Sequence, residues 1–268
     1  MESEDRMDRD SSEVLKCVDE LFFIPDGPHL LKNLWGQLLR TCFVMDREWC
    51  EERGVSCPIV APFHVQEFLD AQGDIGIRPG YKLMRKALYP GQFEKMKVSL
   101  ATTFFSEETA QGILLAVEKG LISPSAKTTG LFFLETARWY KIISSRDMSV
   151  GADTSERGQA DVVFVQNYIE SVRKMTFWRM DNQKPDNTWK PVQTGVIMHG
   201  EVALKLREKV AVNGPMDYLL FSRLFSSSAE NLFSQARAGG DAHPRPVHLR
   251  HVMRLISVAQ HIRASSRG

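Results

Sequence analysis

Residues 21–40 set the architecture expected of this chain, and they begin Leu21-Phe22-Phe23-Ile24-Pro25-Asp26-Gly27-Pro28-His29. The apolar run at residues 21–24 predicts a short buried strand, which the proline-rich segment after it ends. Leucine and tryptophan side chains then recur at helical spacing as far as Arg40. The stretch therefore predicts a strand, a turn and a helix, with Asp26 at the junction.

Asp26 has two interpretations. An aspartate followed closely by proline is a common helix opening, in which the carboxylate caps the first turn. A carboxylate between a strand and a helix can also point out of the fold toward a ligand. The local sequence favours the cap.

A second acidic candidate lies near the other end of the chain. Serines at residues 226–228 lead into Glu230 and a short apolar-periodic run, which paired glycines at 239–240 stop. This pattern predicts one brief helix. Ser227 and Glu230 fit an S-x-x-E capping box, which the local sequence favours. Alternatively, Glu230 is an acidic ligand that a helix start presents to a divalent metal.

The residues between the two candidates predict a series of amphipathic helices and little strand-like alternation. Residues 181–191 predict a turn-rich connection, and residues 145–160 predict an exposed loop. The aromatic helix at 129–144 is expected in the core and not as a platform for stacked bases. The chain is therefore expected to be mainly α. The predicted helices are 43–53, 65–72, 81–88, 93–105, 107–119, 129–144, 162–180 and 196–209.

Composition narrows the class of protein. The 268 residues are 43% hydrophobic with a formal charge of +1, which predicts an ordinary soluble protein without a global basic field. Cys17, Cys42, Cys50 and Cys57 show no C-x-x-C spacing, so we expect reduced thiols in an intracellular protein. No apolar run is long enough to cross a membrane, and the charged residues 1–10 predict a disordered lead-in and no secretory signal.

Familiar catalytic and nucleotide-binding fingerprints are absent from the sequence. There is no G-x-x-x-x-G-K-[ST] loop, no G-x-G-x-x-G turn, no serine-hydrolase elbow and no H-E-x-x-H helix. The seven histidines are dispersed, so no structural metal site is expected. Any chemistry would have to rest on a few separated carboxylates.

Two motifs resemble the P-element-type DNA transposases, which include a vertebrate relative with a THAP zinc finger. Residues 26–33, Asp26-Gly27-Pro28-His29-Leu30-Leu31-Lys32-Asn33, resemble the D-P-P-H-L-L-K-N segment of that family. Residues 229–240 with His243-Pro244 resemble its E-N-F-F-S-x-x-R-x-x-G-G…N-P segment. Gln193-Thr194-Gly195 matches its Q-T-G segment, and residues 97–101 and 135–140 are similar to its helical insertion. The resemblance runs from residue 21 to the C-terminus.

The resemblance implies a ribonuclease-H-like (RNase H-like) catalytic domain interrupted by an all-helical insertion that binds GTP. In that family three carboxylates hold two divalent metals, Mg²⁺ or Mn²⁺, which activate the attacking oxygen and stabilise the leaving one during DNA cleavage and strand transfer. Asp26 would be the second carboxylate and Glu230 the third. The implied domains are a lead-in at 1–20, an RNase H-like remnant at 21–60, the insertion at 61–212 and the C-terminal part of the RNase H-like domain at 213–268.

The sequence also departs from the family pattern. The first catalytic aspartate of the family lies well upstream of the D-P-P-H motif, so we expect that ligand to be missing here and the chain alone to be catalytically incomplete. Ser227 stands where relatives carry an aspartate near the guanine nucleotide, and Gly27 replaces a proline. The cysteine pattern predicts no THAP zinc finger.

Partners and location follow from the same resemblance. The implied partners are transposon-end DNA and a second copy of the chain, with no membrane, in a nuclear or cytoplasmic protein that is not secreted. The alternative is a non-enzymatic nucleotide-binding or protein-interaction module derived from a transposase.

Overall fold

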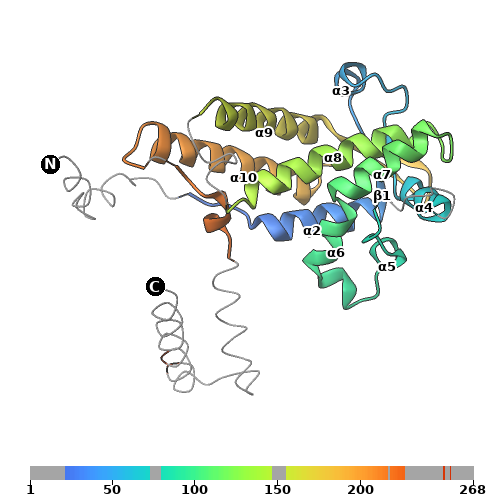
Figure 1. The fold of residues 1–268 in the computed structure, drawn as a ribbon, viewed down its shortest axis with the longest axis horizontal. Coiled ribbons are helices and arrows are strands. Elements are labelled where there is room, and N and C mark those ends of the chain that lie inside the picture. Colours follow the sequence, from blue (N-terminus) through green and yellow to red (C-terminus); the bar gives the residue numbers. More distant parts are fainter. Residues whose placement is uncertain are drawn as a thin grey trace. The chain divides into compact units, whose positions relative to one another are not determined.

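The computed structural model describes residues 22–72, 80–146, 155–216 and 218–226, together with residues 250 and 254. The chain divides into two compact units, Met1–Leu224 and Phe225–Gly268. The first unit is mostly helical with one small antiparallel sheet (Figure 1), which confirms the mainly α expectation. The predicted lead-in at 1–20 and the predicted helix that Glu230 opens lie outside the described residues.

Helices account for most of the first unit. Among the described residues, the α-helices are α2 (Gly27–Leu38), α3 (Arg47–Glu52), α4 (Pro62–Ala71), α5 (Arg85–Leu88), α6 (Val98–Phe104), α7 (Glu107–Glu118), α8 (Ala126–Ile143), α9 (Glu156–Lys174) and α10 (Pro191–Arg207). Shorter turns are the 3₁₀-helices η1 (Glu94–Met96) and η3 (Phe221–Leu224) and the π-helix η2 (Glu208–Val212).

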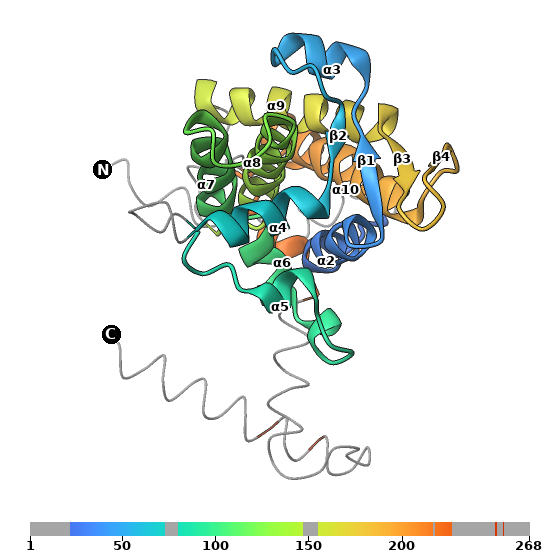
Figure 2. The ribbon, with the colours of Figure 1, turned by 90° about the vertical axis from the view of Figure 1, so that its right-hand side faces the viewer.

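A four-stranded antiparallel sheet joins distant parts of the sequence. Its strands are β1 (Thr41–Val44), β2 (Ile59–Val60), β3 (Thr176–Arg179) and β4 (Lys184–Asp186), in the order β2-β1-β3-β4 (Figure 2). Phe43 of β1 pairs with Phe177 of β3, and their rings meet edge to face with centroids 5.5 Å apart. The sheet therefore ties the end of α2 to the segment between α9 and α10.

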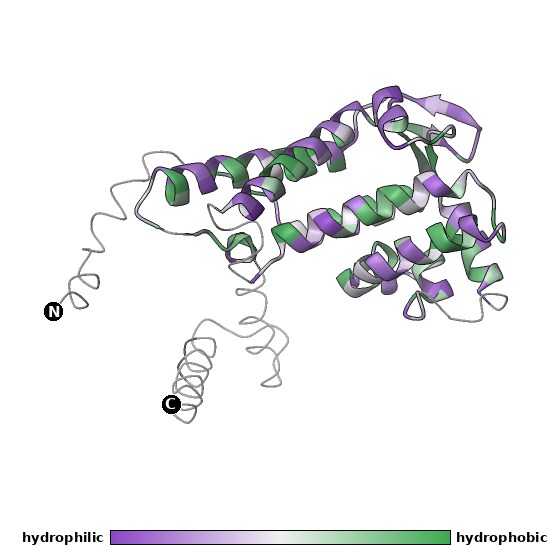
Figure 3. Cartoon of the chain, turned by 45° about the horizontal axis from the view of Figure 1, so that its top comes forward, coloured by the Kyte–Doolittle hydropathy of each residue, from purple (hydrophilic) through white to green (hydrophobic). Residues whose placement is uncertain are grey.

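The core is built around α8, which packs against α7, α9 and β2. Its aromatic side chains Phe132, Phe133 and Trp139 are fully buried, so the predicted core role of this helix is confirmed. Trp139 stacks on Tyr168 of α9 with ring centroids 5.3 Å apart. Each long helix carries both hydrophobic and hydrophilic residues (Figure 3), as expected for helices that bury one face.

Two expectations at the start of the chain are wrong. The described part of the strand predicted at 21–24 belongs to no helix or strand, and Phe23 is 71% exposed. An apolar run forms a strand only where a neighbouring strand pairs its backbone groups, and no described strand pairs with this run. The helix predicted at 43–53 begins instead as β1, and α3 starts only after Asp46, which caps it by accepting from Glu48 N at 3.1 Å.

The predicted helix at 162–180 and the connection at 181–191 also need correction. Helix α9 begins at Glu156, inside the predicted loop, and ends at Lys174. The β-branched and aromatic residues that follow it form β3, and the supposed connection contains β4. A hairpin therefore replaces the last part of the predicted helix.

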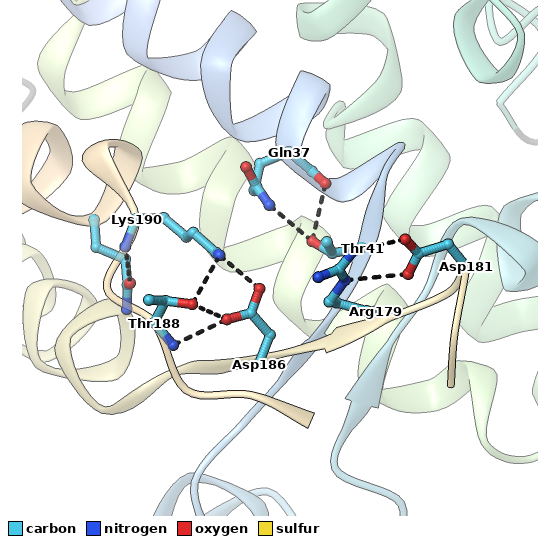
Figure 4. A network of polar contacts seen from close by, with 8 residues as sticks. Gln37, Thr41, Arg179, Asp181, Asp186, Thr188 and Lys190 are labelled. Atoms are coloured by element: carbon cyan, nitrogen blue, oxygen red, sulfur yellow. Dashed lines mark hydrogen bonds and ion pairs between the residues drawn. The ribbon is translucent and has the colours of Figure 1, made fainter. Parts of the chain in front are cut away.

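A polar network stabilises this hairpin and leads into α10 (Figure 4). The Asp186 carboxylate accepts from Lys190 Nζ at 2.6 Å and from the backbone N–H of Thr188 at 3.0 Å. Lys190, followed by Thr188, holds the pKa of Asp186 well below its usual range. Arg179 pairs with Asp181 at 2.6 Å beside the turn. These contacts fix the chain immediately before the first residue of α10.

The structure also bears on the expectations of reduced cysteine thiols and of no segment long enough to cross a membrane. Cys42, Cys50 and Cys57 are free thiols, and burial raises the pKa of the Cys42 thiol to about 11. Within the described ranges, every helix is too short or too polar to cross a membrane.

Candidate active site at the start of helix α2

Asp26 lies directly before α2 and caps it. Its backbone is extended, and its carboxylate accepts the backbone N–H of His29 at 3.4 Å. The His29 imidazole lies 3.9 Å from the same carboxylate. The cap interpretation is therefore confirmed, and the metal-ligand interpretation stays a prediction. Both roles are compatible, because the Asp26 side chain is 18% exposed and its carboxylate has two oxygens.

His199 of α10 holds the backbone immediately before Asp26. Its Nδ1 lies 2.7 Å from the carbonyl oxygen of Pro25, and since a carbonyl only accepts, Nδ1 carries the proton. Burial lowers the pKa of His199, so the ring is neutral at neutral pH. The pKa of Tyr140 on α8 is raised, mainly by burial and to a smaller extent by the negative charge of Asp26. His199 of α10 thus contacts the backbone directly before α2, and Tyr140 of α8 lies within range of the Asp26 charge.

Sequence reasoning missed His199. The seven histidines are dispersed along the sequence, and the contact between His199 and Pro25 joins residues 174 positions apart. A helical position with apolar neighbours on both sides was the available signal for a buried ring, but it does not identify the partner.

The described residues do not by themselves form a metal site. Among them, no group of three histidine, cysteine, aspartate or glutamate side chains could hold a metal ion. Asp26 fits the role of one oxygen ligand, because it is a partly exposed carboxylate, whereas a divalent cation takes several ligands. Glu230 and Ser227 lie outside the described residues. A metal bound here would therefore need donors in addition to Asp26.

The Gln193-Thr194-Gly195 segment has a clear structural role. Gln193 is buried and donates from Nε2 to the carbonyls of Val172 and Met175, at 2.9 and 2.8 Å, at the end of α9. Its Oε1 accepts from Lys190 N at 3.0 Å, which caps the start of α10.

Gly195 serves close packing between helices. A Cβ added at this position would overlap the Leu30 side chain of α2, so the glycine allows α10 to approach α2. Because Leu30 lies one turn after Asp26, the segment sets how α10 packs beside the candidate active site.

A cavity of about 640 Å³ lies between α8 and α9, and we call it the α8–α9 cavity; its lining includes the aromatic rings of Phe164 and Tyr168. Arg138 lies over the Phe164 ring at 4.1 Å. Most of the cations that line the α8–α9 cavity pair with carboxylates of the protein: Arg53 with Glu135, Arg138 with Asp161 and Lys141 with Glu107. A triphosphate needs cations that can pair with its oxygens. Internal ion pairs therefore occupy most of the charge in this cavity.

Comparisons with known proteins agree with the motifs at the start of α2. No family model matches the chain. It is 23% identical over 237 residues to the Transposable element P transposase of Drosophila melanogaster, an alignment that covers 88% of this chain and 30% of that protein.

The fold also has a counterpart among solved structures. The structure named Drosophila P element transposase strand transfer complex matches with a TM-score of 0.71 at 21% identity, over 86% of this chain and 50% of that one. The chain thus spans less than a third of the curated relative and half of the solved chain. It is a distant homologue of the Drosophila P element transposase and shares the fold of that protein over most of its own length.

Proposed function

We propose that this chain works in DNA transposition, as part of a P-element-like transposase that cleaves and transfers DNA strands at an RNase H-like two-metal site. The observation that carries the proposal is the position of Asp26. This residue matches the D-P-P-H motif of the family and lies partly exposed at the start of α2, in a chain related to a transposase over 237 residues.

The proposed domains follow the family pattern. We assign residues 21–60 and 213–268 to the RNase H-like domain and residues 61–212 to the helical GTP-binding insertion. In this assignment β3 and β4 of the insertion extend the sheet that β1 and β2 begin.

Asp26 and Glu230 would hold Mg²⁺ or Mn²⁺ together with a further carboxylate. When bound, the metals would activate the attacking oxygen and stabilise the leaving one. The described residues position the ligand: His199 holds the Pro25 carbonyl, and the first turn of α2 holds the Asp26 carboxylate. Asp26 is therefore oriented independently of the metal.

We expect the 268-residue chain, assayed by itself, not to cleave DNA. The resemblance places two of the three family carboxylates in this sequence, and a pair of carboxylates does not fix two ions. The test is a nicking assay with Mg²⁺ or Mn²⁺ on a transposon end. Turnover that Glu230→Gln abolishes would contradict this expectation and would show that the site is complete.

The family resemblance implies that the helical insertion binds GTP, and calorimetric titration of the chain with GTP tests this binding. Saturable binding supports a retained nucleotide site. Absence of binding favours the alternative, a protein-interaction module derived from a transposase. A DNA substrate would place the working protein in the nucleus, and strand transfer at two transposon ends would suit self-association.

A further inference from the structure

A concave surface lies beside α2, and we call it the basic groove. It has a volume of about 560 Å³ and lies between α2, the residues after α5 and the first residues of α10. Lys32 and Arg40 of the α2 region and Lys95 of η1 line it, together with Tyr89. Its described lining contains no carboxylate.

Most cations of the α8–α9 cavity form ion pairs with carboxylates of the protein, whereas, among the described residues, those of the basic groove do not. Lys32 donates to His29 Nδ1 at 3.1 Å, and no ion pair between described residues involves Lys32, Arg40 or Lys95. The charge is therefore local and uncompensated in a chain whose formal charge is only +1. Such a surface attracts a polyanion, because each phosphate bound displaces condensed counterions.

The size of the basic groove and the exposed aromatic rings beside it favour a single-stranded nucleic acid over a duplex. Tyr89 is 67% exposed, and Phe93, in the same connection, is 85% exposed. Bases of a single strand stack on such rings, whereas duplex bases are already stacked on one another. A volume of this size lies in the usual range of small-ligand sites and can accept one unstacked base.

The direction of the groove connects it to the candidate active site. Lys32 lies within α2, and Arg40 lies in the turn that directly follows the helix. Asp26 lies at the start of the same helix, six residues before Lys32. A strand held by these cations would run beside α2, the helix that begins at the candidate metal ligand.

We propose that the basic groove binds single-stranded DNA, with Lys32, Arg40 and Lys95 on phosphates and Tyr89 stacked on a base. The choice of DNA rests on the proposed function. The groove would then guide the unpaired end of a DNA substrate toward Asp26.

Fluorescence anisotropy with a short labelled oligothymidine and the 268-residue chain tests the phosphate contacts. Binding is measured in EDTA over a range of salt concentrations. The Lys32→Gln/Lys95→Gln double variant should lower the slope of log affinity against log salt by about 1.4, or about 0.7 per lost phosphate contact on a single strand. The matched control is Lys119→Gln/Lys127→Gln, which removes the same charge from exposed positions outside the groove. Equal losses in the two double variants would overturn the proposal, as would absence of binding by the unaltered chain.

Tyr89 tests the stacking contact. Tyr89→Leu should weaken oligothymidine binding roughly tenfold, since one stacked base contributes on that order, while Tyr89→Phe should bind normally. A duplex of the same length should bind more weakly and be insensitive to Tyr89→Leu. Preference for the duplex, or equal binding by Tyr89→Leu and the unaltered chain, would contradict the proposal. Because EDTA removes divalent metal, failure here is distinguishable from failure of the metal site at Asp26.

Discussion

Replacement of Gln193 by glutamate changes one buried group without changing its size. In the unaltered chain, Gln193 Nε2 donates to the carbonyls of Val172 and Met175, while Oε1 accepts from Lys190 N. Glutamate keeps the acceptor but puts a second oxygen against the two carbonyls. The substitution therefore removes two donated bonds and creates a repulsive contact in the core, with no cavity.

The expected destabilisation can be worked from these contacts. A neutral hydrogen bond contributes about 1 kcal/mol net, and a buried acceptor left without a donor costs about 1–3 kcal/mol. The two buried carbonyls deprived of this donor, at about 1–3 kcal/mol each, give roughly 2–6 kcal/mol at pH 7.5. Burial beside carbonyl oxygens should also raise the pKa of the new carboxyl above its ordinary value of about 4.3.

The pH dependence distinguishes this explanation from a general loss of packing. With a raised folded-state pKa, the charge penalty is absent at pH values below the unfolded pKa, grows as pH rises from the unfolded to the folded pKa, and is constant above the folded pKa. Equilibrium urea unfolding of the Gln193→Glu variant, compared with the unaltered chain at each pH, should show a larger loss at pH 7.5 than at pH 4. The control is Gln166→Glu on the exposed face of α9, which should cost within about 0.5 kcal/mol. A loss below 1 kcal/mol at pH 7.5, or one independent of pH, would refute the reasoning.

Two further predictions concern packing and buried histidines. Gly200→Ala should destabilise the fold by about 1–3 kcal/mol, since the added Cβ would overlap Ile169 Cδ1 of α9, and Ile169→Val should recover part of this loss in urea unfolding. Additive losses in the double variant would contradict the contact. Burial lowers the pKa values of His64 and His199 from 6.5, so the unfolded chain takes up protons first and stability should fall as pH drops below that value. Thermal unfolding should show this decline, with a smaller slope in His199→Phe. An unchanged slope in that variant would contradict the assignment.

Long helices were predictable because their signals are local. Predicted helices at 107–119 and 129–144 correspond to α7 and α8 within a few residues. The Ser106 hydroxyl accepts from Thr109 N at 3.1 Å, which is the kind of cap that a sequence displays. Asp26 was likewise identified correctly as a cap from the residues around it.

The sheet was not predictable because its strands are short and their partners are remote. Thr41–Val44 has only four residues, and it is stabilised by pairing with β3, far along the chain. The apolar run at 21–24 has better strand composition but no such partner among the described strands. Pairing therefore decided which of the two runs became a strand.

The candidate site was predictable only where a motif marked it. The motif at residues 26–33 led to Asp26, but no local pattern identified His199 as the residue that holds Pro25. The role of Gln193 was also hidden, because its three hydrogen bonds reach two different helices. The role of Glu230 as a ligand stays a prediction, since that residue lies outside the described part of the chain.

The most direct test of the proposed function is Mn²⁺ binding by the Asp26→Asn variant. Asparagine caps a helix about as well as aspartate, so this change keeps the cap of α2 and removes only the charge that a metal needs. Free Mn²⁺ is measured by electron paramagnetic resonance, with thermal unfolding as the control for folding. We predict saturable Mn²⁺ binding by the unaltered chain, weakened in Asp26→Asn and in Glu230→Gln at an unchanged unfolding temperature. Saturable Mn²⁺ binding that is equal in all three chains would contradict the account, because it would show that Asp26 is only a helix cap.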